Sequence, residues 1–489
     1  MSTEFDSLID ARMQGFTHYL DRTGMSHKQY QYDGVRWCLE NELRPDPPFG
    51  VRGGFIADEM GLGKTIMMIG TFLTNFVRNT LIVLPPVLID QWCLQIYRTT
   101  GHRAMLYYGP NKKTITLEML KAAPIVITSY NTLLLHKNDI LPLLYQVHWG
   151  RVVFDEAHHL RNNKTSRVSS IIQLNARIRW LVSGTPVHNS LKDFYTLCFV
   201  LRLPPNSYKK ASNLSELNRA FVLKRTKASV GILLPNLVIE TKDVYWENEY
   251  EKNMSEIIHT SLKHAGKEER LILMIRARQS CIYPKMLMHK YDELTNYLID
   301  KESVENIGIK FTQNTSKLDI VCNSILERKD NGCGKLIFCH FRDEIDEIGK
   351  RLMAGGLANV VAFDGRTSFA RRREILRTKQ DVIILQIQTG CEGLNLQEDY
   401  SEVYFVSPHW NPAIEDQAIA RCHRIGQNKP VYVKCFIMSD FIKDDEEDEC
   451  DEEGDEDDGV VTTIENYVRA TQQRKRDTAI KCFSPEVVM

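Results

Sequence analysis

Eight residues near the start of the chain have the types and spacing of a phosphate-binding loop. The segment Asp58–Thr65 reads Asp-Glu-Met-Gly-Leu-Gly-Lys-Thr and lies between an apolar stretch, 54–57, and an apolar-periodic run, 66–73. This order predicts a buried strand, a glycine-rich loop and a helix, an arrangement in which backbone N–H groups hold phosphates. Lys64 is then expected to reach the β- and γ-phosphates, and Thr65 to bind Mg²⁺. A glycine-rich turn before a core helix is the alternative for this motif alone.

A second segment has the acids that hydrolysis of a nucleoside triphosphate needs. Residues 151–154 predict another buried strand, and Asp155-Glu156-Ala157-His158 follows at once. In such a site Asp155 holds Mg²⁺ through water, and Glu156 orients and deprotonates the attacking water. Two acids after a strand are often only a solvated turn, but their position after a phosphate loop favours a metal and phosphate site.

A third segment could supply positive charge to the reaction. Gln417, Arg421 and Arg424 follow the spacing i, i+4 and i+7, so on a helix they share one face, and Gly426 is placed to end that helix. Arginine at such a site neutralises charge that develops on the γ-phosphate. From the spacing alone, a surface helix with two solvated arginines is the more common explanation.

Together these segments resemble the Swi/Snf-type DNA-dependent ATPases of helicase superfamily two, in a compact form similar to lodestar-like proteins and baculovirus global transactivators. The variant loop that begins with Asp58 is typical of that family. The further segments that carry the resemblance are Tyr30-Gln31 with Gly34 and Trp37, Leu84–Pro86 with Gln91-Trp92, Thr128–Tyr130, the tail of Asp155–Asn162, Ser183–Pro186 with Asn189, Gly390–Leu396, and Trp410–Gln427. The segment Gly390–Leu396 departs from the family at Gly390-Cys391 and at Glu392.

The resemblance implies roles for individual residues. The residues implied to bind nucleotide are Gln31, which reads adenine, and Asp58, Glu59, Met60, Gly61, Leu62, Gly63, Lys64 and Thr65. Those implied to be catalytic are Lys64, Asp155, Glu156, Gln417, Arg421 and Arg424, with Thr65 and Asp155 holding Mg²⁺. Those implied to contact DNA are Thr128, Ser129, Tyr130, Arg366 and Gly393. The cofactors implied are ATP and Mg²⁺, and the implied partner is double-stranded DNA, with nucleosomes or the transcription machinery as further partners.

Composition indicates a globular protein of a reducing compartment, and its modest basic excess also occurs in globular proteins that do not bind DNA. Of 489 residues, 43% are hydrophobic, and no apolar run reaches the length of a membrane helix. The twelve cysteines include no Cys-x-x-Cys pair, so we expect free thiols and no zinc site. The net charge of −1 conceals a tract, 444–458, with thirteen acids; the rest of the chain has 62 basic and 50 acidic residues. A basic body with an acidic appendage is typical of nucleic-acid binders.

Apolar runs separated by enough residues for crossover helices predict an α/β fold of mostly parallel sheets flanked by helices. The resemblance implies that these sheets form two tandem RecA-like lobes. The expected organisation is an N-terminal extension (1–26), an ATP-binding lobe (27–235), a helical linker or protrusion (236–315), a second lobe (316–480) with a disordered acidic insertion (441–460), and a tail (481–489). For the insertion, an inert solvated loop and a regulator that mimics DNA or binds histones both stay open.

The function expected from these segments is ATP-driven translocation on double-stranded DNA, in the nucleus, with a role in remodelling DNA-bound proteins and in transcription. Two alternatives remain open: a helicase that separates strands, and a non-catalytic transcription regulator on an ATPase fold. The presence of Lys64, Glu156 and Arg421 argues against the last, because a dead site usually loses one of them.

Overall fold

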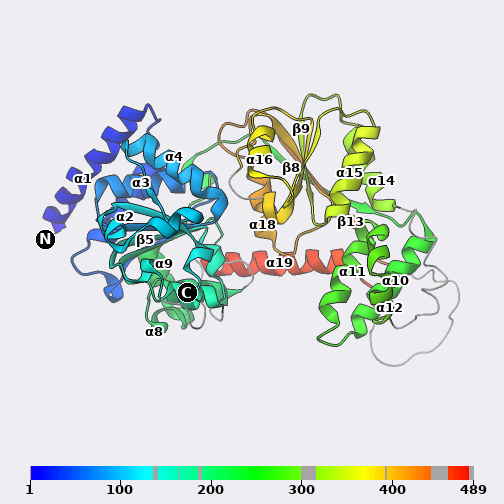
Figure 1. Cartoon of the computed structure of the whole chain (residues 1–489), viewed down its shortest axis with the longest axis horizontal. Helices are drawn as coiled ribbons and strands as arrows, with labels where there is room; N and C mark the ends of the chain where they lie inside the picture. Colours follow the sequence, from blue (N-terminus) through cyan, green and yellow to red (C-terminus); the bar gives the residue numbers. More distant parts are fainter. Residues whose placement is uncertain are drawn as a thin grey trace. The chain divides into compact units, whose positions relative to one another are not determined.

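The computed structural model of the chain describes residues 2–135, 141–162, 165–185, 190–298, 315–390, 394–441 and 461–483. The chain divides into two compact units, Met1–Leu233 with Lys475–Met489, and Leu234–Arg474. Each unit contains one sheet of parallel strands flanked by helices, which confirms the predicted α/β class of two tandem lobes (Figure 1).

The first unit is built on a seven-stranded sheet in the order β3-β4-β2-β5-β6-β1-β7. The strands are β1 (Arg52–Ile56), β2 (Thr80–Leu84), β3 (Met105–Leu106), β4 (Ile125–Ser129), β5 (Trp149–Asp155), β6 (Ala176–Val182) and β7 (Val222–Leu223). The helices are α1 (Ser2–Thr23), α2 (Gln29–Leu43), α3 (Lys64–Thr74), α4 (Ile89–Thr100), α5 (Leu117–Ala122), α6 (Ser166–Ile171), α7 (Leu191–Val200), α8 (Pro205–Tyr208) and α9 (Ala211–Phe221). The strands predicted around residues 54–57 and 151–154 occur as β1 and β5.

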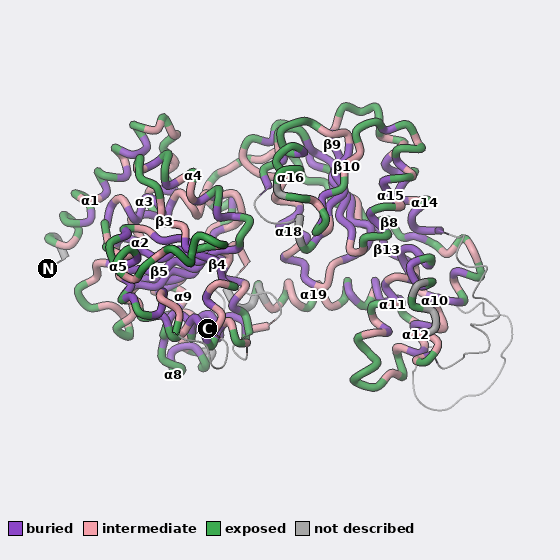
Figure 2. Tube along the Cα trace, in the orientation of Figure 1, coloured by how far each residue is buried: buried purple, intermediate pink, exposed green. Residues whose placement is uncertain are grey.

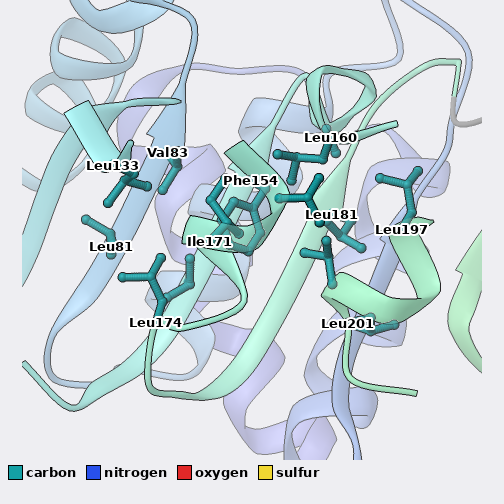
Figure 3. Packing of buried hydrophobic residues seen from close by; sticks show 14 of the residues in the cluster. Leu81, Val83, Leu133, Phe154, Leu160, Ile171, Leu174, Leu181, Leu197 and Leu201 are labelled. Carbon is teal, nitrogen blue, oxygen red and sulfur yellow. The ribbon is translucent and has the colours of Figure 1, made fainter. Parts of the chain in front are cut away.

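Both faces of this sheet are buried, which explains why its strands are continuous apolar runs. Leu81 and Val83 of β2 pack into the core on one face, together with Phe154 (Figure 3), and Ile82 and Leu84 pack into the core on the other. The central strands are accordingly buried along their length (Figure 2).

The residues predicted as an N-terminal extension pack within this unit. Helix α1 places a stripe of buried side chains, Ile9, Met13 and Phe16, in the same core as α3. A Cβ on Gly70 of α3 would lie 2.7 Å from the Phe16 ring, so glycine at this position allows the two helices to approach closely.

The second unit is built on a six-stranded parallel sheet in the order β10-β11-β9-β12-β13-β8. The strands are β8 (Leu237–Val244), β9 (Gly334–Cys339), β10 (Val360–Phe363), β11 (Val382–Gln386), β12 (Tyr400–Phe405) and β13 (Val431–Met438). The helices are α10 (Glu249–His264), α11 (Arg270–Ile282), α12 (Tyr291–Thr295), α14 (Ser316–Leu326), α15 (Arg342–Ala354), α16 (Phe369–Ile375), α17 (Ile387–Gly390), α18 (Pro412–Ile419) and α19 (Ile464–Phe483), whose last residues belong to the first unit.

Strand β8 corrects the prediction that residues 236–315 form only a helical linker. All eight of its residues pair with β13, in register from Leu237↔Val431 to Val244↔Met438. Seven of the eight are exposed, so the strand lacks the alternation of buried and exposed residues from which strands are predicted.

Most of the acidic insertion, residues 442–460, lies outside the described residues, and so does the predicted tail beyond Phe483. The residues on either side of the insertion meet: the N–H of Phe441 donates to the carbonyl of Val461 at 3.3 Å, and the N–H of Thr463 donates to Asp440 Oδ1 at 2.6 Å. Among the described residues no helix is long and apolar enough to cross a membrane.

Candidate nucleoside triphosphate site

Three of the predicted motifs follow three adjacent strands of the first unit. The last paired residues of these strands are in register, with Ile56 of β1 opposite Val182 of β6 and Val182 opposite Asp155 of β5. Since neighbouring strands lie about 4.8 Å apart, the phosphate loop and Asp155 leave the same edge of the sheet about 10 Å from each other. Ser183 leaves that edge between them, and its N–H donates to the carbonyl of Ile56 at 3.0 Å.

The phosphate loop is held open by its own lysine and glycines. Lys64 Nζ donates to the carbonyls of Asp58 at 2.9 Å and Glu59 at 3.4 Å. Gly61 and Gly63 have φ values of 91° and 81°, a conformation that favours glycine. Lys64 begins α3, so the N–H groups of the first turn, which includes Thr65, lie directly after the loop without a side-chain cap.

Gln31, predicted to read adenine, lies against this loop. Its Nε2 donates to the carbonyl of Leu62 at 3.2 Å, and a Cβ on Gly63 would lie 2.4 Å from the same atom. The neighbouring Tyr30 hydroxyl is buried and has no hydrogen-bond partner among the described residues. Met60 lies near the backbone of the motif that follows β6, because a Cβ on Gly184 would lie 3.0 Å from the Met60 side chain.

The Asp155 carboxylate is buried and held by two donors. The indole Nε1 of Trp92 donates to its Oδ2 at 2.7 Å, and the N–H of Glu156 donates to its Oδ1 at 3.0 Å. Burial, and then the neighbouring Glu156 carboxylate, raise the pKa of Asp155 to about 7. A dication beside this carboxylate would favour its charged form, so the residue fits the role of a Mg²⁺ ligand.

Glu156 adopts a conformation that is uncommon for a residue with a side chain. Its φ of 49° and ψ of 50° are left-handed, and such strain is often found at functional sites. Its Oε2 lies 3.2 Å from His158 Nδ1, which is 3.3 Å from the Ser183 hydroxyl. Ala157 is fully buried and begins the turn that carries His158.

Asp58, which stands where a phosphate loop usually has glycine, is fully buried and forms an ion pair. Arg225, 167 positions away, donates to both of its carboxylate oxygens, through Nε at 3.1 Å and Nη2 at 2.6 Å. The next residue, Glu59, pairs with Lys227 Nζ at 2.9 Å. The resemblance places both basic residues in a segment, 224–227, that connects the lobes in the family, and sequence reasoning did not predict their contact with the loop, since only the fold brings them there.

In the second unit Gln417 is buried on α18, and its Nε2 has no hydrogen-bond partner among the described residues. The prediction that Arg421 and Arg424 continue this helix is wrong, because α18 ends at Ile419. The carbonyl of Arg421 instead accepts from the N–H of Leu396 at 3.1 Å.

Both arginine side chains reach the same loop. Arg421 Nη1 donates to the carbonyl of Leu394 at 3.5 Å, and Arg424 Nη1 donates to Asn395 Oδ1. Burial, and then Arg421, lower the pKa of Arg424, which marks a cluster of positive charge suited to an anion. Gly426 does not end the helix, although its φ of 97° places it in a turn.

Three residues predicted to contact DNA have buried side chains that form hydrogen bonds within the protein, and their role at DNA stays a prediction. The hydroxyl of Thr128 donates to the carbonyl of Tyr107 at 2.8 Å, Ser129 caps the turn that follows β4, and the hydroxyl of Tyr130 donates to the carbonyl of Asp155 at 2.7 Å. Trp92, from another segment that carries the resemblance, is also buried and faces Asp155.

Of the other two predicted DNA contacts, Arg366 is partly exposed but pairs with Asp346 at 2.7 Å and with Asp364 at 2.6 Å. A phosphate would have to compete with these two carboxylates. Gly393 lies outside the described residues, as do Pro186 and Asn189.

A lysine-containing phosphate loop and an Asp-Glu-Ala-His turn on one edge of a parallel sheet, followed by a second such sheet, define a helicase-type nucleoside triphosphatase. The chain matches the model of the SNF2-related domain over residues 30–307 and the model of the helicase conserved C-terminal domain over residues 290–426. It therefore belongs to the SNF2-related family, and with it to the DNA-dependent ATPases.

Curated relatives and a solved structure are similar to the chain. A protein of Orgyia pseudotsugata multicapsid polyhedrosis virus named a probable global transactivator is 25% identical over 93% of this chain and 91% of its own length. The ATP-dependent DNA helicase DDM1 of Arabidopsis thaliana is 27% identical over 84% of this chain, which spans 59% of that relative. The Sulfolobus solfataricus SWI2/SNF2 ATPase core, solved in complex with dsDNA, is 22% identical over 84% of this chain and 88% of its own, with a TM-score of 0.40.

Proposed function

We propose that this protein is an ATP-driven translocase on double-stranded DNA that displaces or remodels DNA-bound proteins in the nucleus and acts in transcription. The observation that carries the proposal is the register of Ile56, Val182 and Asp155, which puts a phosphate loop and a pair of acids on one sheet edge. The relatives support it, since one is named an ATP-dependent DNA helicase and another a global transactivator.

The residues fit ATP and Mg²⁺. The uncapped first turn of α3 and the glycine conformations at Gly61 and Gly63 form a cradle for phosphates. Thr65 and Asp155 would hold Mg²⁺, which supplies charge neutralisation to the phosphates when it is bound.

In this mechanism the protein's own residues position the reacting groups and neutralise negative charge. Lys64 leaves its loop carbonyls for the phosphates, and Glu156 orients the attacking water and accepts its proton. Arg421 and Arg424 stabilise the charge that develops on the transferred phosphoryl group, and Gln417 offers its unpartnered amide N–H groups.

The first test is the ATPase rate without DNA, with single-stranded DNA and with duplex DNA. Stimulation by duplex above single strands supports the proposal. Displacement of a triplex strand without opening of a forked duplex supports translocation, whereas unwinding of the fork would establish a strand-separating helicase. If the pure protein hydrolysed no ATP with any DNA, a non-catalytic regulator would be the remaining explanation.

A further inference from the structure

Residues 222–227 of the first unit lie beside the segment that leads into the phosphate loop and are hydrogen-bonded to it. Strand β7 pairs with β1, the N–H of Ala57 donates to the carbonyl of Leu223 at 2.8 Å, and the N–H of Glu59 donates to the carbonyl of Arg225 at 2.8 Å. The backbone of the loop is therefore held on the side away from β6.

The side chain of Arg225 joins this loop to the start of α2. Besides its two bonds to the Asp58 carboxylate, its Nη1 donates to the carbonyl of Tyr30, and its guanidinium lies 5.8 Å from the centre of the Tyr30 ring. A Cβ on Gly34 would lie 2.8 Å from Nη2, so glycine leaves room for the guanidinium.

This contact acts next to the residue predicted to read the base. Tyr30 is adjacent to Gln31, whose amide lies on the loop at Leu62 and Gly63. One planar guanidinium thus fixes the backbone beside Gln31 and the carboxylate at the first position of the loop. Lysine cannot reproduce these contacts, because it has no fork of donors.

We propose that Arg225 is a positioning residue that sets the preference of the site for adenine over guanine by holding Gln31 in register with the phosphate loop. This inference rests on the proposed ATP site and adds to it the residue that controls base selectivity. One lost or misaligned hydrogen bond to the base changes affinity by up to about tenfold, so selectivity is expected to be sensitive to this contact.

The chain offers a matched control in Lys227. Its Nζ pairs with Glu59 at 2.9 Å, and its N–H donates to Glu59 Oε2 at 2.7 Å. Lys227 thus binds the same loop one residue further on, and none of its described contacts is with Tyr30 or Gln31. Loss of its charge should weaken binding of both nucleotides alike.

The experiment measures equilibrium binding of fluorescent ATP and GTP analogues to the full chain, for the wild type, Arg225→Ala, Arg225→Lys and Lys227→Ala, with Tm as a check of folding. Binding needs no hydrolysis, so the result does not depend on turnover. We expect the GTP-to-ATP ratio of Kd to fall about tenfold in both Arg225 variants, the size expected for one lost hydrogen bond to the base, and to stay unchanged in Lys227→Ala.

Arg225→Lys separates positioning from stabilisation. If this variant has the Tm of the wild type but still has a lowered GTP-to-ATP ratio of Kd, Arg225 acts by positioning Gln31 and not by stabilising the fold. If Arg225→Ala does not fold, Arg225→Lys and the double variant Asp58→Asn with Arg225→Gln give the answer. An unchanged ratio in the folded Arg225 variants, or an equal fall in Lys227→Ala, overturns the inference. A wild type that binds neither analogue would instead remove the proposed ATP site itself.

Discussion

The hydrogen bond from Trp92 to Asp155 gives a sharp test of the magnesium site. Phenylalanine at position 92 keeps most of the buried ring but removes the donor that lies 2.7 Å from Asp155 Oδ2, leaving the N–H of Glu156 at 3.0 Å as the other donor to the carboxylate. Asp155 is expected to hold Mg²⁺, so Trp92→Phe should weaken metal binding.

The magnitude follows from the role of groups that hydrogen-bond a metal ligand and orient it. Replacing such a group typically costs about 10- to 100-fold in metal affinity or activity. We therefore expect the Mg²⁺ concentration for half-maximal ATPase activity to rise roughly 10- to 100-fold. The assay is a Mg²⁺ titration at fixed ATP and saturating duplex DNA.

Trp149→Phe is the matched control. Trp149 is also fully buried, on β5, and its Nε1 donates to the carbonyl of Leu144 at 2.8 Å, at the opposite end of the strand from Asp155. Both variants lose one indole hydrogen bond and similar stability. If the two require the same Mg²⁺ concentration, Trp92 does not orient a metal ligand and the reasoning is refuted.

The remaining predictions concern the phosphate site, the arginines and a buried ion pair. Glu156→Gln should bind ATP and barely hydrolyse it, whereas Lys64→Ala should lose both binding and hydrolysis. Filter binding measures the first property and a phosphate-release assay the second. Full turnover by Glu156→Gln would exclude Glu156 as the base. Arg421→Ala should lower kcat about a thousandfold, and normal hydrolysis by this variant would rule out the proposed contribution of the second unit. Glu42, which is 1% exposed, accepts from Arg151 Nε at 2.6 Å, so Glu42→Ala should lower the free energy of unfolding by about 3–5 kcal/mol by leaving a buried charge unpaired. Denaturant titration measures the free energy of unfolding, with Glu40→Ala as the control because the Glu40 carboxylate is partly exposed. Equal losses of stability in the two variants would contradict the prediction.

The arrangement of the central strands was predictable because it follows from local patterns. Continuous apolar runs such as those around Leu81 and Val153 are typical of strands buried on both faces, and their spacing left room for crossover helices. Motifs at the ends of parallel strands must then meet at one edge, so the approach of Lys64 and Asp155 could be anticipated from order alone.

Elements whose side chains lack a regular pattern were not predictable. Strand β8 is exposed on both faces and is a strand only because β13 supplies its hydrogen bonds. Helix α18 stops at Ile419 although nothing in the sequence ends it there, since the backbone of Arg421 pairs with Leu396 instead.

The sequence by itself determined which chemical groups this protein has for the reaction: a lysine, paired acids and arginines in a recognisable order. Only the tertiary structure decided which groups hold them in place. Arg225 meets Asp58 across 167 positions and Trp92 meets Asp155 across 63. The Tyr130 hydroxyl donates to the carbonyl of Asp155 from within the core, a contact that spans 25 positions. Such partners are chosen by packing between distant segments, and a buried charge requires them wherever along the chain they originate.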